Sequence, residues 1–199
     1  MWASNLSLCE QTMNKYVYEN QQNLALGYMV NPTLEQWKIV EGDPFVTQND
    51  FVRLATDTQE ALFTPMTVSE PEVTGGMLTS TGEDKYFYER TADNGTLTWQ
   101  LTFTEQQDVY IYFEASHCEK LKVTIDGETE TYSDKRGHIV HLGQCDAGKV
   151  VTLDFPMDNE YDTGNVKLQM YAFNNNVFES AYTQLADAQL QVTDYDSTH

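Results

Sequence analysis

The stretch "TLTWQLTF", residues 96–103, alternates large apolar side chains with polar ones at a period of two. Its apolar positions are Leu97, Trp99, Leu101 and Phe103. Threonines and Gln100 occupy the positions between them. Successive side chains of a strand point to opposite faces of a sheet, so the pattern is typical of a strand with one buried face.

Further strand-like stretches follow this one at roughly regular spacing. They are "DVYIYFEA", "LKVTI", "HIVHL", "KVVTLDF" and "NVKLQMYAF", between residues 108 and 173. Asn94-Gly95 and Asp126-Gly127 lie between such runs and are interpreted as two-residue hairpin turns, because glycine tolerates positive φ. The rhythm predicts a mainly β fold, an antiparallel β-sandwich or jelly roll.

Helical patterns flank the strands. Residues 44–57 are predicted to form a helix, with Asp43 as N-cap and Pro44 at its first position. "NPTLEQWKIV", residues 31–40, predicts a capped helical turn. "VFESAYTQLADAQ", residues 177–189, predicts an amphipathic helix that buries Phe178, Tyr182 and Leu185.

Two extended stretches, "KYVYE" and "LALGYMV", lie between residues 15 and 30, and "LQVTDYDSTH" at the end of the sequence is interpreted as a strand that stops early. We therefore expect two portions. Residues 1–73 form an N-terminal α+β portion packed on the sandwich, and residues 74–199 form the sandwich with a C-terminal helix and strand. Met1 directly before Trp2 fits a piece of a longer protein.

The charge balance excludes several classes of partner. Eleven Lys and Arg oppose 31 Asp and Glu, for a formal net charge of -20. A nucleic-acid partner is not expected, because too few cations are present to displace phosphate counterions. The same balance opposes docking on an anionic membrane surface. The apolar runs are far shorter than the roughly 20 residues that span a bilayer, so the chain as given is expected to be soluble.

The three cysteines are Cys9, Cys118 and Cys145, with no CxxC motif. A disulfide framework normally shows more cysteines, in even number. Cys118 and Cys145 follow two predicted strands and would pair if those strands were neighbours. The favoured interpretation is reduced thiols.

Catalytic motifs are missing from the sequence. It contains no GxSxG, P-loop, GxGxxG or HExxH pattern. His138 and His141 are three apart on a strand, so they point to opposite faces and cannot ligate one metal together. A glycosidase needs two carboxylates about 5–10 Å apart, and 31 acidic residues select no pair. No catalytic residue is therefore assigned.

One acidic stretch, "DFPMDNEYDTGN", suggests a metal site. Asp158, Glu160 and Asp162 alternate before Gly164. The EF-hand pattern fails, because it needs Gly at its sixth position and Glu at its twelfth. A structural calcium ion in another geometry stays open, and an acidic hairpin loop is the favoured alternative. No other cofactor is expected.

Tyrosines cluster in "KYFYER" and "VYIYF". The candidates for contact with a sugar ring are Tyr86, Tyr88, Tyr110 and Tyr112. Aromatic faces stack on sugars, so these residues suggest a carbohydrate platform. In the second cluster Tyr110 and Tyr112 share one strand face, which also fits the core or rim of a sandwich.

Several segments resemble the YfhO family of bacterial membrane proteins. They are "YVYENQQNLALGYMV" (16–30), "DPFVTQNDFVRLATDTQEALFTPM" (43–66), "VTIDGETETY" (123–132) and "HIVHLGQCDAGKVVTLDF" (138–155). Ala25 stands where the family commonly has proline. The resemblance covers residues 15 to 195 and contains no catalytic motif.

The resemblance implies a polytopic protein with a glycosyltransferase-type membrane region and a large extracytoplasmic part. Some members are connected with sugar decoration of teichoic acids in Gram-positive envelopes. The fragment would then be a non-catalytic accessory domain at the extracytoplasmic face of the cell membrane. Its expected partners are the membrane region of its own parent chain and a cell-wall glycan. Its role would be either to position that glycan or to act as a scaffold for the transferase. The alternatives are a secreted carbohydrate-binding module or glycan hydrolase subunit, and a calcium-dependent adhesin domain.

Overall fold

The structure, a computed structural model, describes residues 6–12, 15–20, 29–133 and 137–188. These residues divide into two compact units. The sandwich unit comprises residues 39–48 and 63–174, and the terminal unit comprises the described residues within 1–38, 49–62 and 175–199. The division differs from the predicted boundary at residue 73, since the C-terminal helix belongs with the N-terminal segments.

Backbone and side-chain contacts explain why the terminal unit joins both ends of the sequence. Its elements are β1 (Leu6–Thr12), β2 (Lys15–Asn20), the 3-10 helix η2 (Pro32–Gln36), the later part of α1 (Pro44–Ala55) and α2 (Asn175–Asp187). Met29 N donates to Ala188 O at 2.8 Å, and Asp57 N donates to Gln184 Oε1 at 2.9 Å.

The helix predictions hold, with one change of face. Asp43 caps α1, because its Oδ1 accepts a hydrogen bond from Val46 N at 2.9 Å. Helix α2 buries a different face from the one predicted, with only one residue in common. The buried residues are Val177, Ala181 and Leu185. The predicted extended stretch at 24–30 and strand at 190–199 lie wholly or mostly outside the described residues.

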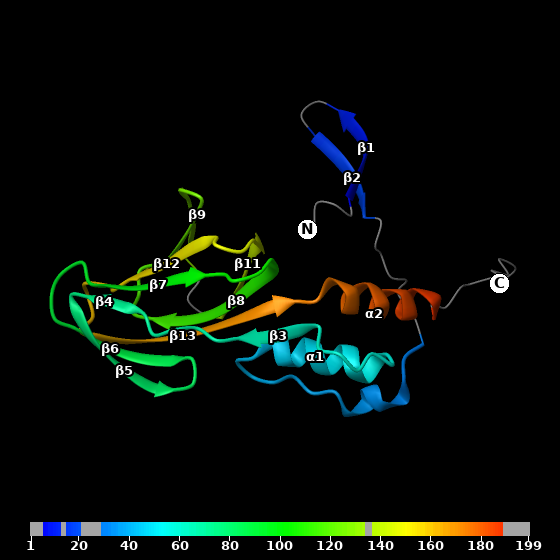
Figure 1. Cartoon of the computed structure of the whole chain (residues 1–199), viewed down its shortest axis with the longest axis horizontal. Helices are drawn as coiled ribbons and strands as arrows, with labels where there is room; N and C mark the ends of the chain where they lie inside the picture. Colours follow the sequence, from blue (N-terminus) through cyan, green and yellow to red (C-terminus); the bar gives the residue numbers. More distant parts are fainter. Residues whose placement is uncertain (1–5, 13–14, 21–28, 134–136, 189–199) are drawn as a thin grey trace, which may run out of the picture. The chain divides into compact units, whose positions relative to one another are not determined.

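Two antiparallel sheets face each other in the sandwich unit, which confirms the predicted fold class (Figure 1). The five-stranded sheet has the order β10-β9-β12-β7-β4, and the six-stranded sheet has the order β11-β8-β13-β6-β5 with β3 also paired to β13. The bounds are β3 (Phe63–Met66), β4 (Glu72–Thr74), β5 (Gly76–Gly82), β6 (Lys85–Arg90), β7 (Thr96–Thr102), β8 (Gln107–Ser116), β9 (Leu121–Ile125), β10 (Glu128–Tyr132), β11 (His138–Cys145), β12 (Val150–Pro156) and β13 (Thr163–Phe173).

The core lies between the sheets, where the alternating stretch of β7 places its apolar residues. Leu97 and Trp99 are fully buried, as is Phe155 from β12. The Trp99 and Phe155 rings meet at 5.4 Å between centroids, and Phe113 from the other sheet meets Phe155 at 5.6 Å. Edge-to-face aromatic pairs of this kind stabilise the core beyond their buried area.

Of the two predicted hairpins, one is confirmed and one is wrong. Asp126-Gly127 joins the paired strands β9 and β10, with positive φ at both residues. Asn94-Gly95 joins β6 to β7, which belong to different sheets. The glycine is needed there for a close approach, because a Cβ on Gly95 would lie 2.6 Å from Met157 Sδ.

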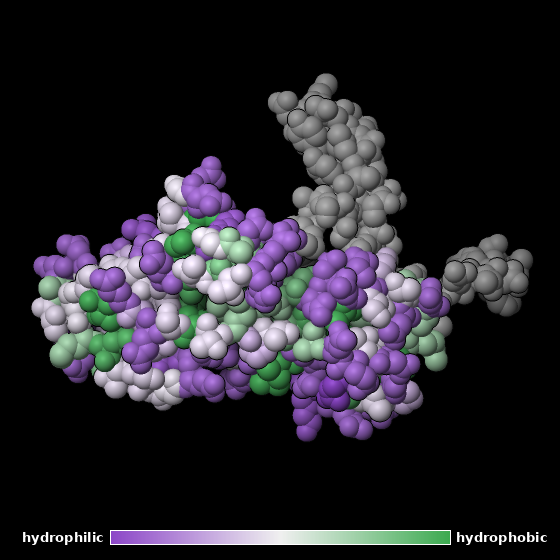
Figure 2. Space-filling view, in the orientation of Figure 1, coloured by the Kyte–Doolittle hydropathy of each residue, from purple (hydrophilic) through white to green (hydrophobic). Residues whose placement is uncertain are grey.

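Cys118 and Cys145 are buried thiols and do not form a disulfide with each other. Burial raises the pKa of the Cys145 thiol. Polar residues cover most of the visible face, with scattered hydrophobic patches, as the net charge leads one to expect (Figure 2). Within the described ranges, no helix combines the length and apolar character needed to cross a bilayer.

Candidate functional site

A pocket of about 550 Å³ opens at one edge of the sandwich unit. We call it the edge pocket. Its ten lining residues are Met66, Thr67, Ser69, Gln100, Leu101, Thr102, Phe103, Thr104, Gln107 and Met170. Each of these residues is uncharged, although charged residues make up 21% of the chain.

Strand pairing leaves the sandwich open at this edge. β4 pairs with β7 only along residues 96–98. The rest of β7 has β12 as its one neighbouring strand within the described part of the chain. In the facing sheet Met66 of β3 pairs with Met170 of β13. The segment after β3 therefore passes beside the later half of β7, and the space between them is the edge pocket.

The floor and the rim of the edge pocket differ in chemistry. Leu101, Phe103 and Met170 are buried and form an apolar floor. The rim consists of exposed hydroxyl and amide side chains, Thr67, Ser69, Gln100, Thr102 and Thr104. Apolar walls with a few directed polar groups are usual in small-molecule sites.

Gln107 supplies a buried acceptor to this pocket. Its Nε2 donates to Glu105 Oε1 at 2.8 Å, which fixes the orientation of the amide. Its Oε1 is buried and finds no hydrogen-bond partner among the described residues. An unmet buried acceptor costs about 1–3 kcal/mol, and a hydroxyl donor that reaches it recovers part of that cost, because the donor gives up its own hydrogen bond to water.

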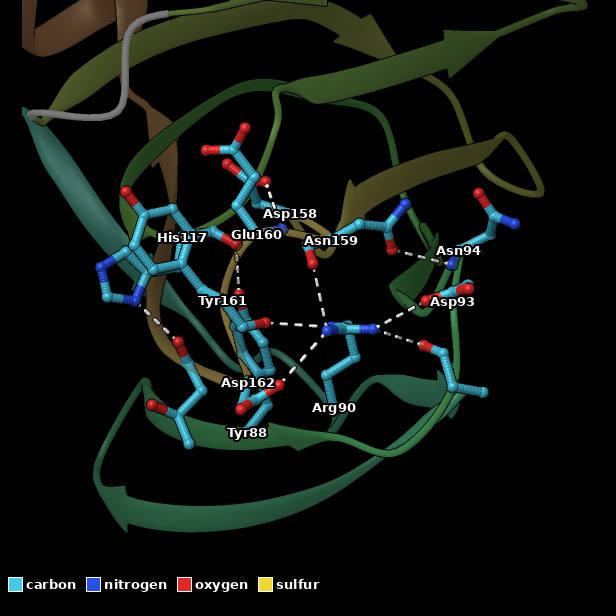
Figure 3. A network of polar contacts seen from close by, with 12 residues as sticks. Tyr88, Arg90, Asp93, Asn94, His117, Asp158, Asn159, Glu160, Tyr161 and Asp162 are labelled. Atoms are coloured by element: carbon cyan, nitrogen blue, oxygen red, sulfur yellow. Dashed lines mark hydrogen bonds and ion pairs between the residues drawn. The ribbon is translucent and has the colours of Figure 1, made fainter.

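A second polar site surrounds Arg90 at the end of β6 (Figure 3). Its guanidinium N–H groups donate to three backbone carbonyls and two carboxylates. The partners are Tyr161 O (2.9 Å), Asn159 O (3.1 Å), Ala92 O (3.5 Å), Asp93 Oδ1 (3.0 Å) and Asp162 Oδ1 (3.3 Å). The Arg90 side chain is only 13% exposed, so the guanidinium fills the space between these oxygens.

The predicted metal ligands lie in this loop but face different partners. Asp158 Oδ1 accepts from Glu160 N at 3.0 Å, whereas Asp162 pairs with Arg90. No group of three or more acidic, histidine or cysteine residues in the described ranges is arranged to hold a metal ion. The loop is also not a hairpin, because it joins β12 and β13 of different sheets.

The four tyrosine candidates are distributed between the core and the outer face of the six-stranded sheet. Tyr86 is buried against Trp99, and the fully buried Tyr88 donates its hydroxyl to His117 O at 2.5 Å. Tyr110 and Tyr112 share the strand face opposite the sandwich core; Tyr110 is partly exposed on it and Tyr112 is buried.

Contacts on that outer face engage both tyrosines. Tyr110 stacks on His141 at 4.3 Å between centroids. Tyr112 donates its hydroxyl to Glu114, and the Lys167 ammonium lies over its ring at 5.4 Å. His138 instead contacts Phe113 of the core, so the two strand histidines do face opposite sides.

Sequence reasoning missed the edge pocket and one exposed ring. Residues 94–104 contain no charged side chain, and this uncharged run in an acidic chain was the available signal. Tyr161 was overlooked because it lies in the acidic loop; it is 43% exposed as a residue and its ring stacks on His117. Met66, Gln107 and Met170 join the site only through strand pairing, which a single sequence does not display.

Comparisons with known proteins give a family and a set of structural likenesses. Residues 3–199 match the model of the family described as "Bacterial membrane protein YfhO". A search of the curated proteins finds no match.

Among solved structures, the chain is similar to a family 35 carbohydrate-binding module from Clostridium thermocellum at 11% identity and a TM-score of 0.36, covering 54% of this chain and 97% of that one. It is similar to a CBM6 module of the laminarinase LamC from Zobellia galactanivorans at 8% identity and a TM-score of 0.36, covering 55% and 99%. It also matches the insecticidal crystal protein Cry2Aa at 17% identity and a TM-score of 0.37, covering 53% of this chain and only 20% of that one. At these TM-scores the likenesses carry no functional argument.

Proposed function

Since the chain belongs to the YfhO family of bacterial membrane proteins, we propose that its sandwich unit is a non-catalytic accessory domain that holds a neutral saccharide. In this proposal the domain lies at the extracytoplasmic face of the membrane. It positions an envelope glycan, such as a teichoic acid being glycosylated, for a glycosyltransferase-type membrane region of the same protein.

The observation that carries the proposal is the edge pocket with its ten uncharged lining residues. A chain with a net charge of -20 repels a polyanion at long range. A neutral sugar escapes this repulsion and is compatible with the single carboxylate, Glu105, that bonds to the lining residue Gln107. The charge pattern thus favours the sugar rings of an envelope polymer over its phosphates.

The pocket chemistry supports a sugar ring in particular. One face of a pyranose presents C–H groups, which match the floor of Leu101, Phe103 and Met170. Its edge presents hydroxyls, which match the threonine and glutamine side chains of the rim. Gln107 also lines the pocket, and its buried Oε1 makes no hydrogen bond among the described residues.

The same lining opposes a hydrolytic role. Glycoside hydrolysis uses two carboxyl groups on either side of the scissile bond. A sugar in the edge pocket meets hydroxyl, amide, thioether and hydrocarbon groups instead. We therefore assign binding and positioning to the pocket, and assign glycosyl transfer to the membrane region of the parent protein.

Calorimetric titration of the 199-residue chain tests this assignment. The ligands are neutral oligosaccharides of several linkages, with a glycerol phosphate polymer as the anionic comparison. We expect binding of at least one neutral oligosaccharide and at least tenfold weaker binding by Gln107→Leu. Gln144→Leu, at an exposed position of β11, is the matched control and should bind like the wild type.

Two outcomes contradict the proposal. If no neutral oligosaccharide binds, the domain is better explained as a scaffold for the membrane region. If Gln107→Leu and Gln144→Leu both bind the saccharide as tightly as the wild type does, the saccharide lies outside the edge pocket.

A further inference from the structure

We propose that Tyr161 forms a second saccharide-contact site, in which its ring receives the apolar face of a neutral sugar. This inference rests on the proposed function for its ligand class. It concerns a separate part of the sandwich unit, however, and its residues do not line the edge pocket.

The Tyr161 ring is exposed and yet held in a fixed orientation. Tyr161 is 43% exposed as a residue. One face of the ring lies against His117, with the centroids 3.9 Å apart and the planes within 2° of parallel. His117 Nδ1 lies 2.7 Å from Thr163 O, which fixes the backing imidazole (Figure 3).

Hydrogen bonds also fix the backbone that carries the ring. Arg90 Nε donates to Tyr161 O at 2.9 Å, and Tyr161 N donates to Asp158 O at 3.1 Å. Asn159 Oδ1 accepts from Asn94 N at 3.1 Å and so ties the loop to the turn before β7. A platform ordered in advance loses little conformational entropy when a ligand binds, which leaves more of the contact energy as affinity.

The surroundings of the ring select among ligands. A tyrosine combines an apolar ring face with a polar hydroxyl. A sugar ring likewise combines an apolar C–H face with a hydroxyl-bearing edge, so the two surfaces match. Glu160 and Asp162 are exposed in the same loop and offer acceptors for sugar hydroxyls. The same carboxylates repel phosphate and uronate groups, so the class is a neutral saccharide.

The Tyr161 site, called the platform below, lies far enough from the edge pocket for the two sites to bind independently. Thr163 lies beside His117, whereas Met170 lines the edge pocket, and both belong to β13. Seven residues of a strand span roughly 23 Å. A disaccharide is too short to reach both sites, whereas a polymer that engages both gains avidity from the link between them.

Amide chemical shifts of the 199-residue chain, titrated with cellobiose and with maltose, test the inference. We expect shifts at residues 158–163 in addition to those at the edge pocket. Tyr161→Ala should abolish the loop shifts and leave the pocket shifts intact. Tyr161→Phe keeps the ring and should keep the affinity of the loop site within about threefold, because stacking and not the hydroxyl provides the contact.

Each other result decides one of the two proposals. Loop shifts that persist in Tyr161→Ala, or pocket shifts without loop shifts, overturn the platform and leave the edge pocket standing. Loop shifts that depend on Tyr161, without any pocket shifts, support the platform and overturn the edge pocket. If neither disaccharide causes any amide shift, the platform is overturned. Titration with longer oligosaccharides then tests the edge pocket.

Discussion

Arg90 organises the loop end of the sandwich unit through its five guanidinium contacts. Asp93 and Asp162 are 83% and 92% exposed, so their ion pairs with Arg90 are screened by solvent and contribute little. The bonds to the backbone carbonyls of Ala92, Asn159 and Tyr161 therefore carry most of the stabilisation.

Truncation of Arg90 should accordingly destabilise the sandwich unit. We expect Arg90→Ala to lower the free energy of unfolding by about 2–3 kcal/mol, measured by urea unfolding. Arg90→Lys should lose most of the same amount, because an ammonium cannot reproduce the planar fork. Arg53→Ala removes an exposed ion pair and is the control, with an expected change of at most about 0.5 kcal/mol. Equal effects of Arg90→Ala and Arg53→Ala would contradict this account.

Tyr112 should make the free energy of unfolding fall at alkaline pH. Burial, with the hydrogen bond and charge of Glu114, raises the pKa of Tyr112 to about 12. The folded chain favours the neutral phenol, so this stabilisation is complete below the unfolded pKa of about 10 and is lost as pH rises through about 12. Burial also raises the pKa of Tyr171, which acts in the same direction.

Unfolding free energies measured from pH 9 to 12 should therefore fall, and Tyr112→Phe should reduce the slope of that fall. A phenylalanine cannot ionise, so the comparison isolates one phenol. An unchanged slope in Tyr112→Phe would show that Tyr112 does not contribute to the pH dependence.

At the scale of elements, the connection between β6 and β7 depends on close backbone packing. A Cβ on Gly95 would meet Met157 Sδ at 2.6 Å and Gly75 O at 3.0 Å. Overpacking of this kind costs typically 1–3 kcal/mol, and Gly75 O belongs to the backbone and cannot rotate away.

Gly95→Ala should thus lower the free energy of unfolding by about 2 kcal/mol in a denaturant titration. Gly82→Ala is the control, because its nearest atom would be Lys85 Cδ at 4.0 Å, and it should be close to neutral. If Gly95→Ala and Gly82→Ala have the same free energy of unfolding, steric crowding at the connection between β6 and β7 does not explain the glycine at position 95.

The loop between β12 and β13 gives a prediction about metal ions. Two of its backbone carbonyls and the Asp162 carboxylate accept hydrogen bonds from Arg90, which supplies there the positive charge that a calcium ion would otherwise bring. We expect a chelator such as EDTA to leave the thermal midpoint unchanged. A fall in the midpoint that added calcium restores would contradict this expectation.

The strands could be predicted where side chains alternate, whereas the sheet to which each strand belongs could not. Leu97 and Trp99 indicate the buried face of β7 because the period of two is visible in the sequence itself. Asn94-Gly95 and Asp126-Gly127 look alike, yet only the second joins paired strands, since sheet membership depends on contacts distant in sequence. The buried face of α2 differs from the predicted face for the same reason. Val177 and Ala181 are buried by tertiary packing, which the sequence of the helix does not display.

At the scale of the molecule, charge and pocket chemistry point the same way. Acidic residues far outnumber basic ones in the chain, whereas the edge pocket is lined by uncharged residues from β3, β7, β8, β13 and the segments after β3 and β7. The uncharged run at 94–104 is visible in the sequence, but its meeting with Met66 and Met170 depends on the pairing of β3 with β13. Membership of the YfhO family then gives this surface a context at a bacterial membrane.

The most direct test of the account is a crystal structure of the chain soaked with the neutral oligosaccharide that binds it best. The account predicts a sugar ring on the floor of Leu101, Phe103 and Met170, with one hydroxyl about 2.7–3.0 Å from Gln107 Oε1. A saccharide bound elsewhere while the edge pocket holds only solvent would contradict it.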